Sequence, residues 1–93
     1  MNQSQLLQKA VQIGDKARAF LSSELGQYVA DRAQAEIDDA LEKLANVDPT
    51  DSNAVRQHQN DLHRAESALM WLAEAIQNGD AALQTMELED ATD

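Results

Sequence analysis

The chain of 93 residues has no cysteine, one proline, three glycines and three aromatic residues. Without cysteine it can form neither a disulfide nor a thiolate metal site, and it has no thiol nucleophile. With only Phe20, Tyr28 and Trp71 as aromatics, the apolar content is mostly alanine and leucine. Because alanine buries little area, the core gains less from hydrophobic transfer than a hydrophobic content of 43% suggests. Such a thin core favours self-association or a partner chain.

Basic residues are also scarce. Seven of them face 17 acidic residues, which gives a net charge of -10. This balance argues against direct binding to DNA, RNA or an anionic membrane. Two interpretations of the acidity remain: an ordinary solvated surface, or an acidic face that mimics nucleic acid or docks on a basic protein.

Long apolar runs are absent as well. The longest, residues 68–73, is far shorter than the ~20 residues that a membrane-spanning helix needs. Residues 1–8 are polar and do not resemble a secretory signal. We therefore expect a protein that is neither secreted nor embedded in a membrane.

Apolar residues that recur every three or four positions predict an all-α fold in a single domain, residues 1–93. The expected helices span about 4–21, 24–45 and 52–86. Ser22 or Ser23 can cap the second helix, and Asp51 or Ser52 can cap the third after the turn at Pro49. Gly14 lies inside the first helix, where a glycine often marks close packing.

The third helix carries a heptad pattern. Apolar residues occupy its a positions throughout, and its d positions are apolar except at His58 and Gly79. Small alanines fill most positions before each a residue, which indicates burial against two neighbours. These sets are Val55, Leu62, Leu69, Ile76 and Leu83 (a); His58, Ala65, Leu72, Gly79 and Met86 (d); and Ala54, Asp61, Ala68, Ala75 and Ala82 (before a).

The helix lengths predict a three-helix arrangement built on a long antiparallel helical hairpin. At 1.5 Å per residue the third helix would be ~52 Å long and the second ~33 Å, so the third overhangs. The first helix is the natural cover for that overhang. We expect residues 87–93 to be an acidic, frayed tail. An alternative is that Gly79 ends the third helix and Asp80 caps a short fourth one.

A search for chemistry finds little. No glycine-rich phosphate loop and no nucleophile elbow is present. His58 and His63 are five residues apart, which puts them on different faces of a helix, and His63-x-x-Glu66 reverses the order used in di-iron bundles. We therefore expect no enzyme activity, no cofactor and no metal.

Two groups of residues are candidate contact surfaces. The second helix carries an acidic face, Asp31, Asp38, Asp39 and Glu42, which is most simply a solvated surface. On the third helix Met70 and Trp71 lie off the heptad seam, and Trp71 has polar neighbours such as Glu74. Trp71 either receives the first helix, against Phe20, or anchors a partner. We select Met70, Trp71 and Glu74 as the candidate partner-binding residues.

Several segments carry a family resemblance: residues 14–21 (GDKARAFL), Leu25, Tyr28-Val29, Arg56, Leu62 and residues 75–83 (AIQNGDAAL). In these segments the chain resembles short helical proteins of tailed bacteriophages and prophages, encoded among head-assembly genes. That group commonly has a proline between its first two helices, where this chain has Ser22-Ser23. The resemblance implies a phage setting, in the host cytoplasm or the virion, and transfers no functional residue.

These observations predict a non-enzymatic protein-protein interaction module. In the phage setting it would be a virion-associated or assembly component that oligomerises or docks on a protein partner. The alternative is an acidic inhibitor, either a DNA mimic or a blocker of a basic site on a host protein.

Overall fold

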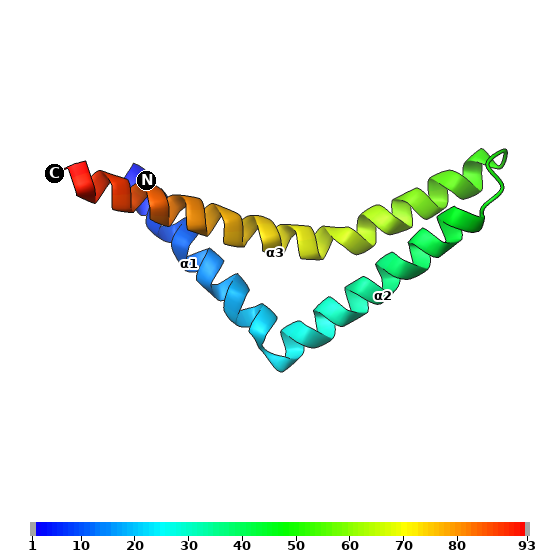
Figure 1. Ribbon diagram of the computed structural model, residues 1–93, viewed down its shortest axis with the longest axis horizontal. Coiled ribbons are helices and arrows are strands. Elements are labelled where there is room, and N and C mark those ends of the chain that lie inside the picture. Colours follow the sequence, from blue (N-terminus) through cyan, green and yellow to red (C-terminus); the bar gives the residue numbers. More distant parts are fainter. Residues whose placement is uncertain (1, 93) are drawn as a thin grey trace.

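The computed structural model describes residues 2–92, which form three α-helices and no strand (Figure 1). The helices are α1 (Gln3–Ser22), α2 (Glu24–Asn46) and α3 (Ser52–Thr92). The predicted all-α fold with three helices is confirmed, and its bounds agree with the sequence to within a residue or two, except at the end of α3.

Helix α3 is the long side of a triangle that α1 and α2 close (Figure 1). α2 runs antiparallel to the N-terminal half of α3, and α1 packs on its C-terminal half, as the overhang predicted. α1 and α2 diverge from α3 toward the corner where they meet. The molecule measures 61 × 30 × 21 Å.

The corner between α1 and α2 depends on Ser23 and Gly26. The Ser23 hydroxyl accepts a hydrogen bond from the Gly26 amide at 3.0 Å, so Ser23 is the cap of α2. A Cβ atom on residue 26 would overlap the Phe20 carbonyl oxygen. Only glycine therefore allows the second helix to start so close to the end of the first.

The turn between α2 and α3 is held by two aspartates. The Asp48 carboxylate accepts hydrogen bonds from the Thr50 amide at 2.9 Å and the Thr50 hydroxyl at 2.7 Å. The Asp51 carboxylate accepts from the Ala54 amide at 3.1 Å and so caps α3. Of the two expected caps, Asp51 is therefore the one used.

Gly79 does not end α3, so the alternative with a short fourth helix is wrong. It lies in the middle of the helix and packs against Gly14 of α1. A Cβ atom on residue 79 would lie 3.0 Å from the Ala10 carbonyl oxygen and 3.1 Å from the Gly14 Cα. The glycine pair thus lets two helix backbones touch, a use of glycine that outweighs its low helix propensity.

The end of α3 also differs from the expectation. The helix continues past Met86 to Thr92, so residues 87–92, expected as a frayed tail, are helical; Asp93 lies outside the described residues. The N-terminus of α1 lies alongside this segment. There the Gln3 side-chain amide donates to the Glu89 carboxylate at 3.4 Å. Contact with α1 gives the last turns of α3 a neighbour that the sequence pattern did not reveal.

Within the expected apolar face of α3, the small residues are packed most closely. Among the described residues the buried hydrophobic ones are all alanines: Ala17, Ala33, Ala40 and Ala82. Ala82 is 5% exposed, whereas Leu83, at an a position, is 45% exposed. The closest contacts therefore run along the d positions and the small residues before a, because only small side chains fit between helices this close. Ala68, midway along this line, is exposed where α1 and α2 have diverged from α3.

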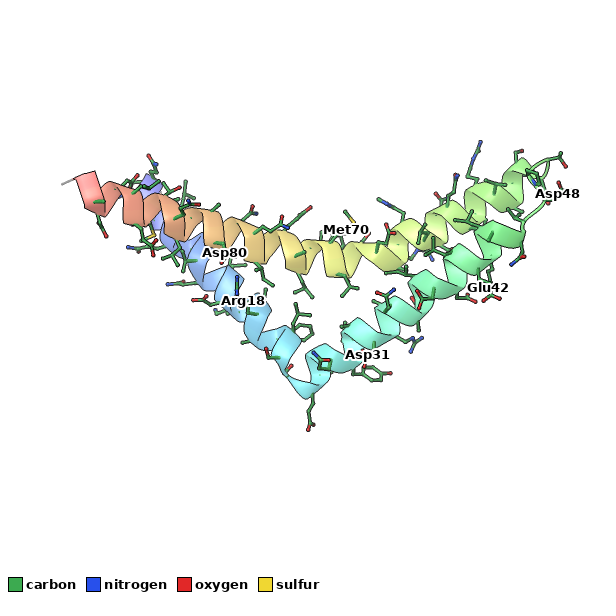
Figure 2. The ribbon with its side chains drawn as sticks, viewed as in Figure 1. Arg18, Asp31, Glu42, Asp48, Met70 and Asp80 are labelled. Carbon is green, nitrogen blue, oxygen red and sulfur yellow. The ribbon has the colours of Figure 1, made fainter. Side chains whose placement is uncertain are left out.

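An ion pair bridges the α1–α3 crossing. The Arg18 Nη2 atom lies 2.8 and 2.6 Å from the two carboxylate oxygens of Asp80 (Figure 2). Both side chains are more than half exposed, so the pair contributes at most ~1 kcal/mol. The crossing is therefore stabilised mainly by its close backbone packing.

We expect Gly79→Leu to separate α1 from α3. The added side chain must enter a space occupied by the Ala10 carbonyl and the Gly14 Cα, so the free energy of unfolding should fall by ~1–3 kcal/mol or more. Gln77→Leu, at an exposed position two residues earlier, is the matched control. Urea denaturation followed by circular dichroism measures both, and equal stability of the two variants would contradict the packing described here.

The turn at Asp48 should respond to acid. The hydrogen bond from the Thr50 amide, followed by that from the Thr50 hydroxyl, lowers the pKa of Asp48 below its ordinary 3.8. Because the pKa of Asp48 is lower in the folded state, its ionised carboxylate stabilises the fold at pH values above 3.8. This stabilisation is lost as the pH falls through the lowered pKa. The native chain should therefore have a higher melting temperature than Asp48→Asn near neutral pH, and the difference should become smaller between about pH 5 and pH 3. Thermal melts measure it, and a difference in melting temperature that stays constant across this range would contradict the lowered pKa of Asp48.

Candidate functional site

A shallow groove of about 270 Å³ lies beside the glycine crossing of α1 and α3. Ala10 and Ile13 line it from α1, and the residues from α3 are Trp71, Glu74, Ala75 and Asn78. Trp71 is 67% exposed and Ile13 is 46% exposed. The groove therefore presents two large apolar side chains to solvent on adjacent helices.

Helical spacing explains how these side chains come together. Trp71, Glu74 and Asn78 are three and four residues apart, so they lie on one side of α3. Ala10 and Gly14, and Ala75 and Gly79, form the contact between the helices themselves. Since that contact accepts only small residues, Ile13 and Trp71 are displaced to its flank and remain exposed.

The structure brings together two of the three candidate partner-binding residues. Trp71 and Glu74 both line the groove, whereas Met70 points away from α1 and α2 on the outer side of α3 (Figure 2). The structure does not support the alternative in which the first helix covers Trp71, because Trp71 is largely exposed. Trp71 lies beside Ala10 and Ile13 of α1, not in a closed core with Phe20, and two-thirds of it is exposed.

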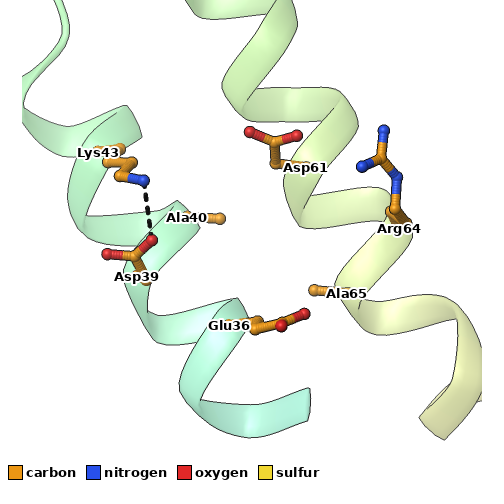
Figure 3. A pocket seen from close by; sticks show the side chains of 7 residues that line it. All are labelled: Glu36, Asp39, Ala40, Lys43, Asp61, Arg64 and Ala65. Atoms are coloured by element: carbon orange, nitrogen blue, oxygen red, sulfur yellow. Dashed lines mark ion pairs between the residues drawn. The ribbon is translucent and has the colours of Figure 1, made fainter. Parts of the chain in front are cut away.

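A second pocket, of about 240 Å³, lies between α2 and α3 (Figure 3). Its lining is mostly charged and comprises Glu36, Asp39, Ala40, Lys43, Asp61, Arg64 and Ala65. Lys43 Nζ pairs with the Asp39 carboxylate at 2.9 Å. That hydrogen bond, with the charge of Asp39, raises the pKa of Lys43, and the charge of Asp61 adds to the effect.

This pocket brings carboxylates and cations together between two helices. Asp39 is occupied by Lys43, one turn further along the same helix, as in an ordinary surface ion pair. Within residues 2–92 no three His, Asp or Glu side chains are grouped closely enough to hold a metal ion. The pocket is best described as a solvated, charged groove of a helical hairpin.

The predicted acidic face of α2 is divided. Asp31, Asp38 and Glu42 are exposed, and helical spacing places all three opposite the buried Ala40. Asp39, by contrast, lies on the flank and lines the charged pocket. The outward row therefore has three carboxylates, of which Asp38 accepts a hydrogen bond from Gln34 at 3.0 Å.

The histidines lie apart, as their spacing predicted. His63 is exposed and His58 is half-buried in the hairpin. The Nδ1 atom of His58 is buried and has no hydrogen-bond partner among the described residues. His58 does not belong to a group of three or more His, Asp or Glu side chains within the described residues.

The sequence pattern missed several exposed apolar residues. The heptad pattern placed Leu83 in the packed seam, and the structure leaves Leu83, together with Leu6 and Ile13 of α1, largely exposed. Leu6 and Ile13 are one heptad apart, a spacing that could have indicated a separate stripe on the flank of α1. In the part of the chain that the structure describes, the exposed large apolar residues are Leu6, Ile13, Leu25, Tyr28, Leu41, Met70, Trp71, Leu83 and Leu88.

The exposure of Trp71 leads to a prediction about stability. Trp71→Ala should change the free energy of unfolding by no more than ~0.5 kcal/mol, as a surface substitution does. Leu72→Ala, at the half-buried position one residue later, should cost more, ~2 kcal/mol. Chemical denaturation at the lowest practical protein concentration, where self-association adds least, measures both. A larger loss in Trp71→Ala than in Leu72→Ala would assign Trp71 to the core.

Comparisons with protein-family models, with curated proteins and with solved structures found no match to this chain. Among the described residues, none of the three helices combines the length and the apolar content needed to cross a bilayer. The function must therefore be argued from the surfaces of the molecule itself.

Proposed function

We propose that this chain is a non-enzymatic protein-protein interaction module whose contact surface is the groove containing Trp71. The observation that carries the proposal is the exposure of Trp71, at 67%, beside Ile13 in a groove with a single charged residue, Glu74. Tryptophan is enriched among the residues that dominate binding energy at protein interfaces. An apolar groove with one polar edge is the arrangement that such an anchor uses.

The size of the groove favours a side chain over a small-molecule ligand. Its volume of about 270 Å³ falls below the ~300–1,000 Å³ of typical ligand sites, and it is open to solvent. Its rim provides the Glu74 carboxylate and the Asn78 amide, which can orient an incoming chain by hydrogen bonds.

The biological setting is proposed from the sequence resemblance alone. A likeness to short helical proteins of tailed phages supports a virion-associated or assembly component, acting in the host cytoplasm or the virion. In that setting the partner would be another protein of the assembling particle or a second copy of this chain.

A second candidate function is supported by the outward acidic row. Asp31, Asp38 and Glu42 lie on the exposed side of α2, away from the groove. Together with the net charge of -10, this row suits an acidic inhibitor that mimics DNA or occupies a basic site on a host protein.

Partner capture distinguishes these functions. Immobilised protein should retain a virion or assembly protein from lysate of cells producing the phage, and retention should persist at high salt because the groove is apolar. Trp71→Ala should weaken binding by ~30-fold, the effect of losing an anchor residue. Met70→Ala, an exposed apolar position on the outer side of α3, is the control and should bind normally.

The acidic alternative has a different signature. A partner lost at high salt, and lost on replacing Asp31, Asp38 and Glu42 by their amides, would favour the inhibitor. Equal binding by Trp71→Ala and the native chain would refute the groove as the contact surface.

A further inference from the structure

The folded chain exposes more surface than its size requires. Its accessible area is 6971 Å², whereas a folded monomer of 10.2 kDa exposes about 5,300 Å². Its radius of gyration is 18.5 Å, against about 12 Å for a compact domain of this length. Across the described residues no large side chain is fully buried, and the buried hydrophobic residues are four alanines. The elongated shape explains part of the excess, and large apolar side chains contribute to the exposed area.

The excess area is an upper limit on what a second copy would cover on each subunit. It amounts to about 1,700 Å². Obligate dimers bury about 1,000–2,500 Å² on each subunit, whereas transient complexes bury about 800 Å² or less. We propose that two copies of this chain associate through the face that carries Leu6, Ile13 and Trp71, with the groove of each copy receiving Trp71 of the other. This inference rests on the proposed function and names its partner.

That face is continuous across the three helices. Leu6 and Ile13 are one heptad apart on α1, and Ile13 and Trp71 line the same groove. Tyr28, eleven residues before Asp39, lies on the same side of α2 as that pocket residue. Arg64 of the charged pocket and Trp71 of the apolar groove are also one heptad apart, so both pockets open on one side of α3.

Charge complementarity supports a second copy in spite of the net charge. α1 is the only one of the three helices with a positive balance, three basic residues against one acidic, whereas α3 has two basic against seven acidic. Lys9 lies four residues before Ile13 and Lys16 three residues after it, so both lie beside the groove on α1. On α3 the groove is lined by Glu74. A two-fold axis would place the lysine edge of one copy on the acidic edge of the other.

Two-fold symmetry also suits the contact residue. In an isologous contact the same patch serves both subunits, so one tryptophan per chain supplies two anchors. Burial of both would remove the most exposed large apolar side chain of the monomer from water.

Sedimentation equilibrium of the native chain tests the proposal. The mass should rise from 10.2 kDa toward twice that value with concentration, and the melting temperature should rise with it. Because Trp71 is the only tryptophan, its fluorescence should shift to shorter wavelength as the dimer forms. A monomer at all concentrations overturns the dimer. Capture of a different partner through Trp71 would then still support the proposed function, so the two failures are distinguishable.

Matched variants locate the interface. Trp71→Glu and Ile13→Glu should each raise the dissociation constant at least ~30-fold. Met70→Glu adds the same charge at the neighbouring residue on the outer side of α3 and should leave the constant within about threefold. Circular dichroism establishes that each variant is folded. In Ile13→Glu, which keeps Trp71, the concentration-dependent fluorescence shift should be lost, because Trp71 is no longer buried by a second copy. A dimer that survives both groove variants, or that Met70→Glu also breaks, overturns this face.

Discussion

The contact between Gly14 and Gly79 is the constraint on which the rest of the structure depends. Each glycine lies against the backbone of the other helix, with the Ala75 carbonyl facing Gly14 and the Ala10 carbonyl facing Gly79. A Cβ atom on either glycine would lie 3.0 Å from the facing carbonyl oxygen, so neither position has room for a larger residue unless the helices shift. At this distance only small residues fit, which is why Ala17 and Ala82 are the next residues to be buried.

Such close packing has an energetic consequence. Burying an alanine removes far less apolar area from water than burying a leucine does, so each contact along α3 contributes little. Ordering a helix of 41 residues still costs conformational entropy at every residue. The triangle thus combines well-fitted helix contacts with a small hydrophobic gain, and a protein in this condition gains stability by covering its remaining apolar side chains with another chain.

The sequence predicted where the helices lie better than which residues of each helix make the closest contacts. Periodicity located all three helices, and the proline turn and helix lengths predicted the hairpin with α1 over the overhang. The pattern predicted an apolar face made of the a and d positions and widened by the alanines before each a position. It did not indicate that the closest contacts would be made by the small residues of that face, since interhelical distance is a tertiary property that the periodicity of one helix does not report. The same reason explains why the sequence suggested that Gly79 could end the helix. The low helix propensity of glycine is a local property, whereas its packing partner Gly14 lies 65 residues away in the chain.

The exposure of the groove follows from that packing and not from chance. To bury Ile13 and Trp71 within one molecule, α1 would have to move away from α3 to make room for large side chains between them. The glycines and alanines at the crossing would then leave voids, which close-packed interiors do not tolerate. The small residues at the crossing therefore have two consequences. They bring the helices into close contact, and they leave the larger apolar side chains beside the contact open to solvent. A second copy can satisfy both, because it covers the flanks without separating the helices.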